Sequence, residues 1–493
     1  MKVPPRQGRR PPGPAPPIDT AGAPAPRSRL GEGGRESLVD NRTSHVIVAF
    51  HGDGGGTEEL TWGQRDVWDL MRRTGRTMNI GGTVPAAEGE TVERVAAVLR
   101  LLMSRHQALR TRLSLVDGEP PRQVVSTGGE IALEVLDAAG DPAEAAEQVR
   151  VRYQTTAFDP CTQWPVRMAV VRAGGTPTHI VVMYYHVVVD GFGINAIVRD
   201  LANLDPAAGV ATVPVQGTGP LELARQQRTP AALRASAQSL RYWHRQLLRI
   251  PPADPPSADP RAGGLPSGGG APGGVPGQPR FWEVVCGSPA TALAVRRVSA
   301  RTRVASGPVL LAAYAVATAH LTGSTTAVVQ VIVSNRFRPG FAEAVGSLRQ
   351  FGLCVIDVTG PFDAVVARAW SAAIGAYKHG YYDPVAHREL TAGRDLSCYL
   401  NDRRAEDRDE GAGPVPTEDD VRAARDATTV RWGVREDTYD GALYLHVEDD
   451  ANYSLWGDTH RFAPEAVERC ARDVETVLVE AALDLVTVPA APR

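Results

Sequence analysis

The chain has 493 residues, and 53 basic against 56 acidic side chains give it a net charge of −3. A near-balanced charge brings no general attraction to phosphate backbones or anionic membranes, so a nucleic-acid partner is not expected. No run of about 18 apolar residues and no apolar secretory core at the N-terminus are present, which predicts a cytoplasmic protein outside the membrane. Five widely spaced cysteines form neither a CxxC metal motif nor a disulfide framework.

Two segments differ from the rest of the chain in composition. Residues 1–44 are rich in Pro, Gly and Arg and have no apolar period, which predicts a disordered tail. Residues 251–280 consist largely of Pro and Gly, which predicts a flexible linker. The remaining residues, 45–250 and 281–488, are therefore expected to form two lobes.

Each lobe alternates helical and strand patterns, which predicts an α/β fold. In the first lobe, apolar residues at helical spacing predict helices over residues 91–106 and 193–204, and a β-rich run predicts a strand over residues 178–185. The second lobe is expected to hold a helix, two strands and a further helix in chain order, over residues 307–321, 327–335, 351–358 and 362–380.

A histidine follows the strand predicted over residues 178–185. His186 stands at the end of this strand, Asp190 comes four residues later, and Gly191 opens the next helix. Histidine at such a position suits general-base chemistry, because its ordinary pKa lies near neutrality. Gly191 is expected to allow a backbone geometry that a side chain would block. A hydrogen-bonded core histidine fits the same pattern, so these residues alone leave both interpretations open.

Several segments resemble the motifs of the condensation domains of nonribosomal peptide synthetases. Residues 185–191, YHVVVDG, resemble HHxxxDG, with Tyr185 in place of the first histidine. Residues 60–68, LTWGQRDVW, resemble LSxAQxxLW, and residues 105–113, RHQALRTRL, resemble RHExLRTxF. Shorter matches follow in the order expected for the family: FD at 158–159, PVR at 165–167, YW at 242–243 and SNR at 334–336.

One motif of the second lobe departs from the family pattern. Residues 345–346 and 351–354 resemble IGxFVNT, but residues 347–350 lengthen the motif and Leu353 replaces its asparagine. These differences fall on the second-lobe wall of the site that the resemblance implies. They therefore bear on which acceptor the protein takes.

The resemblance implies two chloramphenicol-acetyltransferase-like lobes in a V-shaped pseudo-dimer, with the active site in a tunnel between them. His186 would act as the general base, and N–H groups near Gly191 would support the oxyanion. Asp190 would form a structural ion pair, for which Arg110 is the expected partner; the alternative for Arg110 is a solvated helix residue. Arg336 is a further site-supporting candidate, with a surface arginine at a strand end as its alternative.

The resemblance also implies an acyltransferase that forms an amide or ester bond in specialised-metabolite biosynthesis. The donor would be an acyl or aminoacyl thioester on the phosphopantetheine arm of a carrier protein, and the acceptor a small molecule. No permanently bound cofactor and no metal are expected. Because the remaining residues leave no space for an adenylation or carrier segment, a free-standing monomer is expected. A CoA-dependent acyltransferase of the same superfamily and a non-catalytic recruitment module are the alternatives.

Overall fold

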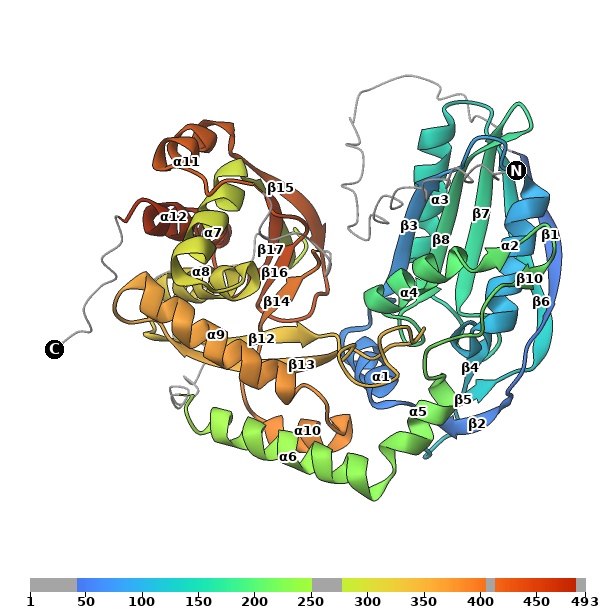
Figure 1. The fold of residues 1–493 in the computed structure, drawn as a ribbon, viewed down its shortest axis with the longest axis horizontal. Helices are drawn as coiled ribbons and strands as arrows, with labels where there is room; N and C mark the ends of the chain where they lie inside the picture. The colour runs from blue at the N-terminus through green and yellow to red at the C-terminus, as the bar shows by residue number, and fades with distance from the viewer. Residues whose placement is uncertain (1–41, 251–276, 405–412, 485–493) are drawn as a thin grey trace, which may run out of the picture.

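The computed structural model describes residues 42–250, 277–404 and 413–484. Two lobes lie side by side and meet around helix α1 (Trp62–Thr74) (Figure 1). Each lobe is a mixed β-sheet with helices packed against it. The α/β fold predicted from the sequence is therefore confirmed.

The first lobe is built on a five-stranded sheet with the order β1-β6-β7-β8-β3. Its strands are β1 (Arg42–His51), β3 (Asn79–Pro85), β6 (Gly128–Asp137), β7 (Val166–Ala173) and β8 (Thr176–Tyr185). Helix α3 (Pro142–Thr155) covers one face, and the helices α2 (Val92–Arg105) and α4 (Gly191–Leu201) pack in the core on the other. Strand β8 is hydrogen-bonded on both sides, so its end is held firmly in the sheet.

Smaller elements surround this sheet. They are a three-stranded sheet of β2 (Gly56–Glu59), β4 (Thr111–Ser114) and β5 (Arg122–Val125), and the two-residue strands β9 (Leu204–Asp205) and β10 (Val210–Ala211). Helix α1 begins with a capping box, in which Thr61 and Gln64 bond each other's backbone N–H. This reciprocal cap fixes the start of the helix. The helix ends at Gly75, whose φ of 71° requires the left-handed region.

The second lobe is built on a seven-stranded sheet with the order β13-β12-β14-β16-β17-β11-β15. Its strands are β11 (Phe281–Gly287), β12 (Thr326–Val333), β13 (Gln350–Asp357), β14 (Cys398–Asp402), β15 (Thr429–Glu436), β16 (Leu443–Val447) and β17 (Asn452–Asp458). The main core is formed with helices α7 (Pro289–Thr302), α8 (Ser306–Thr322), α9 (Phe362–Lys378), α11 (Glu418–Ala424) and α12 (Pro464–Ala482). Helix α8 is apolar around its whole circumference, and it is almost entirely buried.

Two segments cross between the lobes. Helix α6 (Pro230–Leu247) falls in the predicted first lobe, but it buries Trp243 against the second-lobe residues Phe351 and Tyr382. Helices α5 (Pro220–Gln227) and α10 (Pro384–Thr391) lie next to it. Residues 334–349, called the crossing segment below, leave the second-lobe sheet and bond to the first lobe. The predicted boundary at residue 250 is thus wrong for α6, because its apolar face finds its partners in the other lobe.

Parts of the predicted tail and linker are ordered. Strand β1 begins at Arg42, so the last three residues of the predicted tail pair with β6 instead of being disordered. At the end of the predicted linker, Arg280 forms an ion pair with Asp458 at 2.6 Å. Backbone pairing and charge pairing hold these two ends in place. Residues 1–41 and 251–276 lie outside the described residues, so the rest of both predictions is untested.

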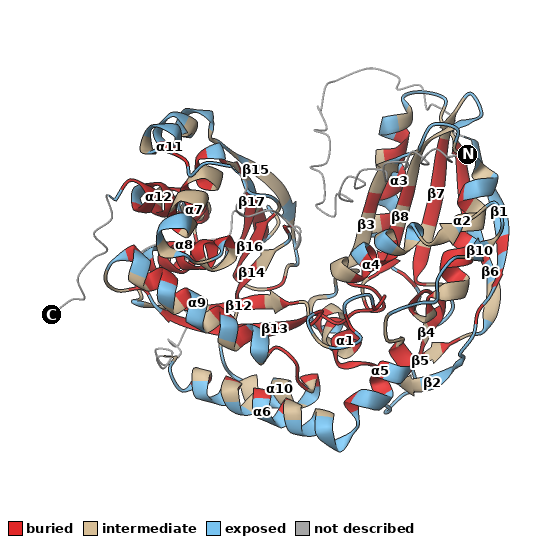
Figure 2. Ribbon diagram, viewed as in Figure 1, coloured by how far each residue is buried: buried red, intermediate tan, exposed pale blue. Residues whose placement is uncertain are grey.

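Buried residues concentrate in the strands of both sheets and on the inward faces of the helices (Figure 2). Within the described ranges, no single helix combines the length and apolar character needed to cross a membrane. Helices α7 and α8 meet that requirement only as a pair, bent by 110°, and by length and composition alone. Four of the five cysteines are buried, and Cys161 is exposed.

Candidate active site

His186 lies in the turn between strand β8 and helix α4. The N–H of Val188 donates to the carbonyl of Tyr185 at 3.0 Å and closes this turn. The Nδ1 atom of His186 is buried and has no hydrogen-bond partner among the described residues. Burial and, to a smaller extent, the charge of Arg349 lower the pKa of His186 to about 4, and the charge of Asp190 opposes this shift. At neutral pH the ring is uncharged and able to accept a proton.

Asp190 joins the two lobes beside this turn. It caps helix α4, because its Oδ1 accepts from the N–H of Gly193 at 2.7 Å. The same oxygen accepts from the guanidinium of Arg336 at 2.6 Å, and both side chains of this ion pair are buried. Its Oδ2 accepts from the N–H groups of Leu348 at 2.7 Å and Arg349 at 3.0 Å. Four donors thus offset the buried charge, and three of them come from the second lobe.

Arg110 is not the partner of Asp190, so the predicted pairing is wrong. Its guanidinium donates to the backbone carbonyl of Asp53 at 2.7 Å and to that of Ser126. The side chain is completely buried, and burial lowers its pKa, so a solvated helix residue is also the wrong interpretation. Arg110 holds first-lobe loops together. The cation that pairs with Asp190 is Arg336. The sequence analysis named Arg336 only as a further site-supporting candidate.

Comparisons with known proteins identify the family of the chain. The Condensation domain profile matches residues 64–349, which include both partners of the Asp190–Arg336 ion pair. The chain belongs to the condensation domain family. Nonribosomal peptide synthetase kk1B of Curvularia clavata is 29% identical over 320 residues, and enniatin synthase of Fusarium equiseti is 24% identical over 338 residues. These matches cover 62% and 66% of this chain but only 2% and 10% of the relatives.

Solved condensation domains share the fold of most of the chain. The domain that mediates chain release from the enacyloxin polyketide synthase matches with a TM-score of 0.66 and 18% identity. This match covers 88% of the present chain and 84% of the other. At such low identity the similarity supports the two-lobed fold alone.

Tyr185 occupies the place of the first histidine of the condensation motif and is a core residue. It is 4% exposed, and its ring lies 5.6 Å from that of Phe158. Burial raises the pKa of its hydroxyl. The neutral phenol therefore packs in the first-lobe core, and the substitution leaves His186 as the only histidine of the motif.

The glycine that the turn requires is Gly193, not Gly191. A Cβ on Gly191 would meet only Ile80, at 3.9 Å, and the φ of Gly191 is not positive. A Cβ on Gly193 would lie 2.8 Å from the carbonyl oxygen of Gly346 in the crossing segment. The predicted backbone role of Gly191 is therefore wrong. The steric constraint falls two residues later because the crossing segment packs directly on the first turn of α4.

Two site residues were not identified from the sequence. Arg349, in the crossing segment, is 5% exposed and forms an ion pair with Asp66 of helix α1 at 3.1 Å. Burial raises the pKa of Asp66 to about 6, and Arg349 opposes that shift. The sequence did mark the segment that holds Arg349 as unusual, because residues 347–350 lengthen the condensation motif. That its side chain pairs with Asp66 of helix α1 follows only from the folded arrangement.

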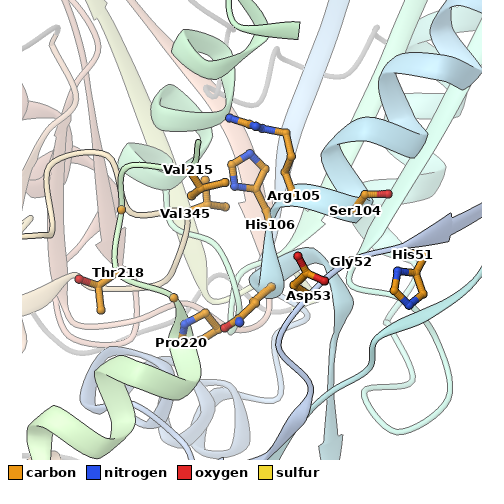
Figure 3. Close-up of a pocket in the computed structure, with 13 residues that line it drawn as sticks. His51, Gly52, Asp53, Ser104, Arg105, His106, Val215, Thr218, Pro220 and Val345 are labelled. Atoms are coloured by element: carbon orange, nitrogen blue, oxygen red, sulfur yellow. The ribbon is translucent and has the colours of Figure 1, made fainter. Parts of the chain in front are cut away.

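A cavity of about 550 Å³ opens in the first lobe, and His186 is not among its lining residues. Asp53, Ser104, Arg105, His106 and Thr218 are among those that line it (Figure 3). The tunnel predicted at His186 is thus not this cavity and stays a prediction. Within the described ranges, no three His, Cys, Asp or Glu side chains gather in a way that could hold a metal ion.

Proposed function

We propose that this condensation domain transfers an acyl or aminoacyl group from a carrier-protein thioester to an amine or hydroxyl of a small acceptor. The observation that carries the proposal is the uncharged ring of His186 at the end of β8, beside a turn held rigidly by Asp190. A neutral histidine with fixed surroundings is suited to proton transfer, which typically contributes ~10²–10⁴-fold in rate.

In the proposed reaction, His186 accepts the proton of the acceptor as its nitrogen or oxygen attacks the thioester carbonyl. The phosphopantetheine thioester supplies an activated carbonyl and a sulfur leaving group. His186 then returns the proton to the departing sulfur, so no covalent enzyme intermediate is needed. The N–H of Gly193 is already bonded to Asp190, so other N–H groups of the first turn of α4 would support the oxyanion.

The test supplies the purified protein with the same acyl group as three separate thioester donors, on a carrier protein, on CoA and on N-acetylcysteamine. Amide or ester product from the carrier-bound donor supports the proposal, provided that His186→Ala abolishes it. His179→Ala is a matched control, because His179 lies on the same strand and its ring, among the described residues, bonds only to the neighbouring Thr178. Turnover that is faster with CoA would favour a CoA-dependent acyltransferase.

A non-catalytic recruitment module is the second candidate, and Tyr185 in place of the first histidine favours it. Binding of a partner protein without product from any of the three donors would support that role. The proposed setting is biosynthesis of a nonribosomal peptide type of metabolite, by a cytoplasmic and monomeric protein.

A further inference from the structure

Helix α9 (Phe362–Lys378) is apolar on the side that faces water as well as on the side that faces the core. Its outer side carries Trp370, Ile374 and Tyr377, which are 48%, 49% and 41% exposed (Figure 2). The spacing of four and three residues places them in one row along the helix, called the α9 stripe below. No residue from 369 to 377 is charged, although one side of this stretch is exposed.

Other helices of the same lobe differ from α9 in this respect. Helix α8 is apolar around its circumference, but it is almost entirely buried. Helix α12 is partly exposed, and its exposed residues are all charged: Glu465, Arg469, Arg472 and Glu480. A helix that is apolar on all sides is normally buried, and exposed apolar side chains that gather in one place mark contact surfaces. The α9 stripe therefore has the character of a surface that another molecule covers.

Helix α6 lies next to α9 (Figure 1). The ring of Tyr242 stacks on that of His379, with 4.5 Å between the ring centroids. A Cβ on Gly375 would lie 2.4 Å from the hydroxyl oxygen of Tyr242, so the two helices touch there. Because Gly375 lies between two members of the stripe, this contact places the last turn of α6 beside it.

Positive charge surrounds this contact. Lys378 is the last residue of α9 and is exposed. Arg245 lies in the last turn of α6 and Arg249 follows that helix, and both are exposed. Among the described residues, none of these three cations pairs with a carboxylate. Burial lowers the pKa of His379, and Lys378 and Arg245 lower it as well, in agreement with cations on both helices. Cations beside apolar side chains complement a partner that carries acidic side chains.

We propose that the α9 stripe docks an α-helix of a partner protein, whose apolar face covers Trp370, Ile374 and Tyr377 and whose acidic side chains meet the surrounding cations. The backbone N–H and C=O groups of α9 bond within the helix, so a partner cannot add a strand here and must pack side chain against side chain. Tryptophan, tyrosine and arginine are the residues that most often dominate the binding energy of protein interfaces.

A protein partner fits this surface better than a membrane does. Binding to a bilayer scales with the apolar area that enters it, and three side chains on one helix supply little. The docking surface lies on the second lobe, outside the turn that holds His186. The inference is therefore independent of the proposed function.

The experiment measures the binding of two synthetic amphipathic helices of about 18 residues to the full chain by fluorescence anisotropy. Both peptides carry leucines at helical spacing, and the other positions are glutamate in one and lysine in the other. The glutamate peptide should bind saturably, more tightly than the lysine peptide, and more weakly at high salt. Trp370→Glu should weaken its binding by at least about tenfold, and Lys378→Glu by about threefold. Val116→Glu is the matched control and should leave binding unchanged, because Val116 is 54% exposed but lies in the first lobe.

Absence of saturable binding, equal binding of the two peptides, or binding that Trp370→Glu leaves unchanged would overturn the proposal. Ile374→Glu replaces Trp370→Glu if that variant does not fold. Binding to vesicles of phosphatidylcholine and phosphatidylglycerol, without binding of the glutamate peptide, would assign the stripe to a membrane surface instead. Self-association that light scattering detects in the wild type and not in Trp370→Glu would assign it to a second copy of this chain.

Discussion

The turn at residues 186–193 and the crossing segment at residues 334–349 meet at one carboxylate, but they differ in how their geometry arises. The turn takes its shape from a strand end, a helix cap and one glycine, all within eight residues. The crossing segment takes its shape from hydrogen bonds to Asp190, more than 140 residues earlier in the chain. The position of His186 is thus set locally, whereas three of the four hydrogen-bond donors to Asp190 come from the other lobe.

Removing the carboxylate of Asp190, which both regions share, should have the largest effect on the unfolding free energy. Asp190→Ala leaves the guanidinium of Arg336 buried without its partner, and the loss of a buried partner typically costs about 3–5 kcal/mol. We expect a similar loss of unfolding free energy for Arg336→Ala, measured by denaturant titration. In the double variant the two losses should be far from additive.

Arg110→Ala is the control for this comparison of single and double variants. Arg110→Ala should also destabilise the protein, because it removes a buried donor to Asp53 and Ser126. Its effect should add to that of Asp190→Ala within about 0.5 kcal/mol, since the two residues share no contact. A larger departure from additivity would mean that Asp190 and Arg110 interact, as the sequence analysis predicted.

Removing the reacting group should separate chemistry from stability. His186→Ala should lower kcat by ~10²–10⁴-fold, because proton transfer is lost, while the melting temperature changes little. Steady-state turnover and a thermal melt on the same preparation check this. A comparable fall in rate for His179→Ala would mean that strand β8 as a whole, and not His186, is required.

A pair of glycine substitutions tests how closely the two regions pack. Gly193→Ala should cost about 1–3 kcal/mol, because its methyl group would meet the carbonyl of Gly346 and push the crossing segment away. Gly191→Ala, two residues earlier, should cost far less, since the space there is open. Equal losses would contradict a requirement set by contact with the crossing segment, because helix propensity alone favours alanine at both positions.

The smallest effect is expected in the core beneath the turn. Tyr185→Phe keeps the apolar packing on Phe158 and should change the unfolding free energy by less than about 1 kcal/mol. Tyr185→His restores the family pair but places a polar ring in the core, at a cost of about 1–3 kcal/mol. Equal unfolding free energies for Tyr185→His and Tyr185→Phe would show that water reaches this position more easily than its burial indicates.

Local patterns predicted much of the fold. Residues 178–185 gave a strand and residues 91–106 a helix, because one period of side chains decides each of them. His186 was found because it stands at the end of such an element. The partner of Asp190 was misassigned: Arg110 and Arg336 both lay in family motifs, and only their positions in the folded chain distinguish them. Asp66 and Arg349 are 283 residues apart, so no local pattern could join them.

The position of helix α6 has a consequence for protein engineering. Trp243 is fully buried, with its ring 5.6 Å from that of Tyr382 and 4.3 Å from that of His387, both in the second lobe. A chimera joined inside the Pro/Gly-rich stretch after Ile250 would therefore set the α6 of one parent against the aromatic residues of another. A junction at Thr229, between α5 and α6, would move the helix together with its partners and leave that part of the core from a single parent.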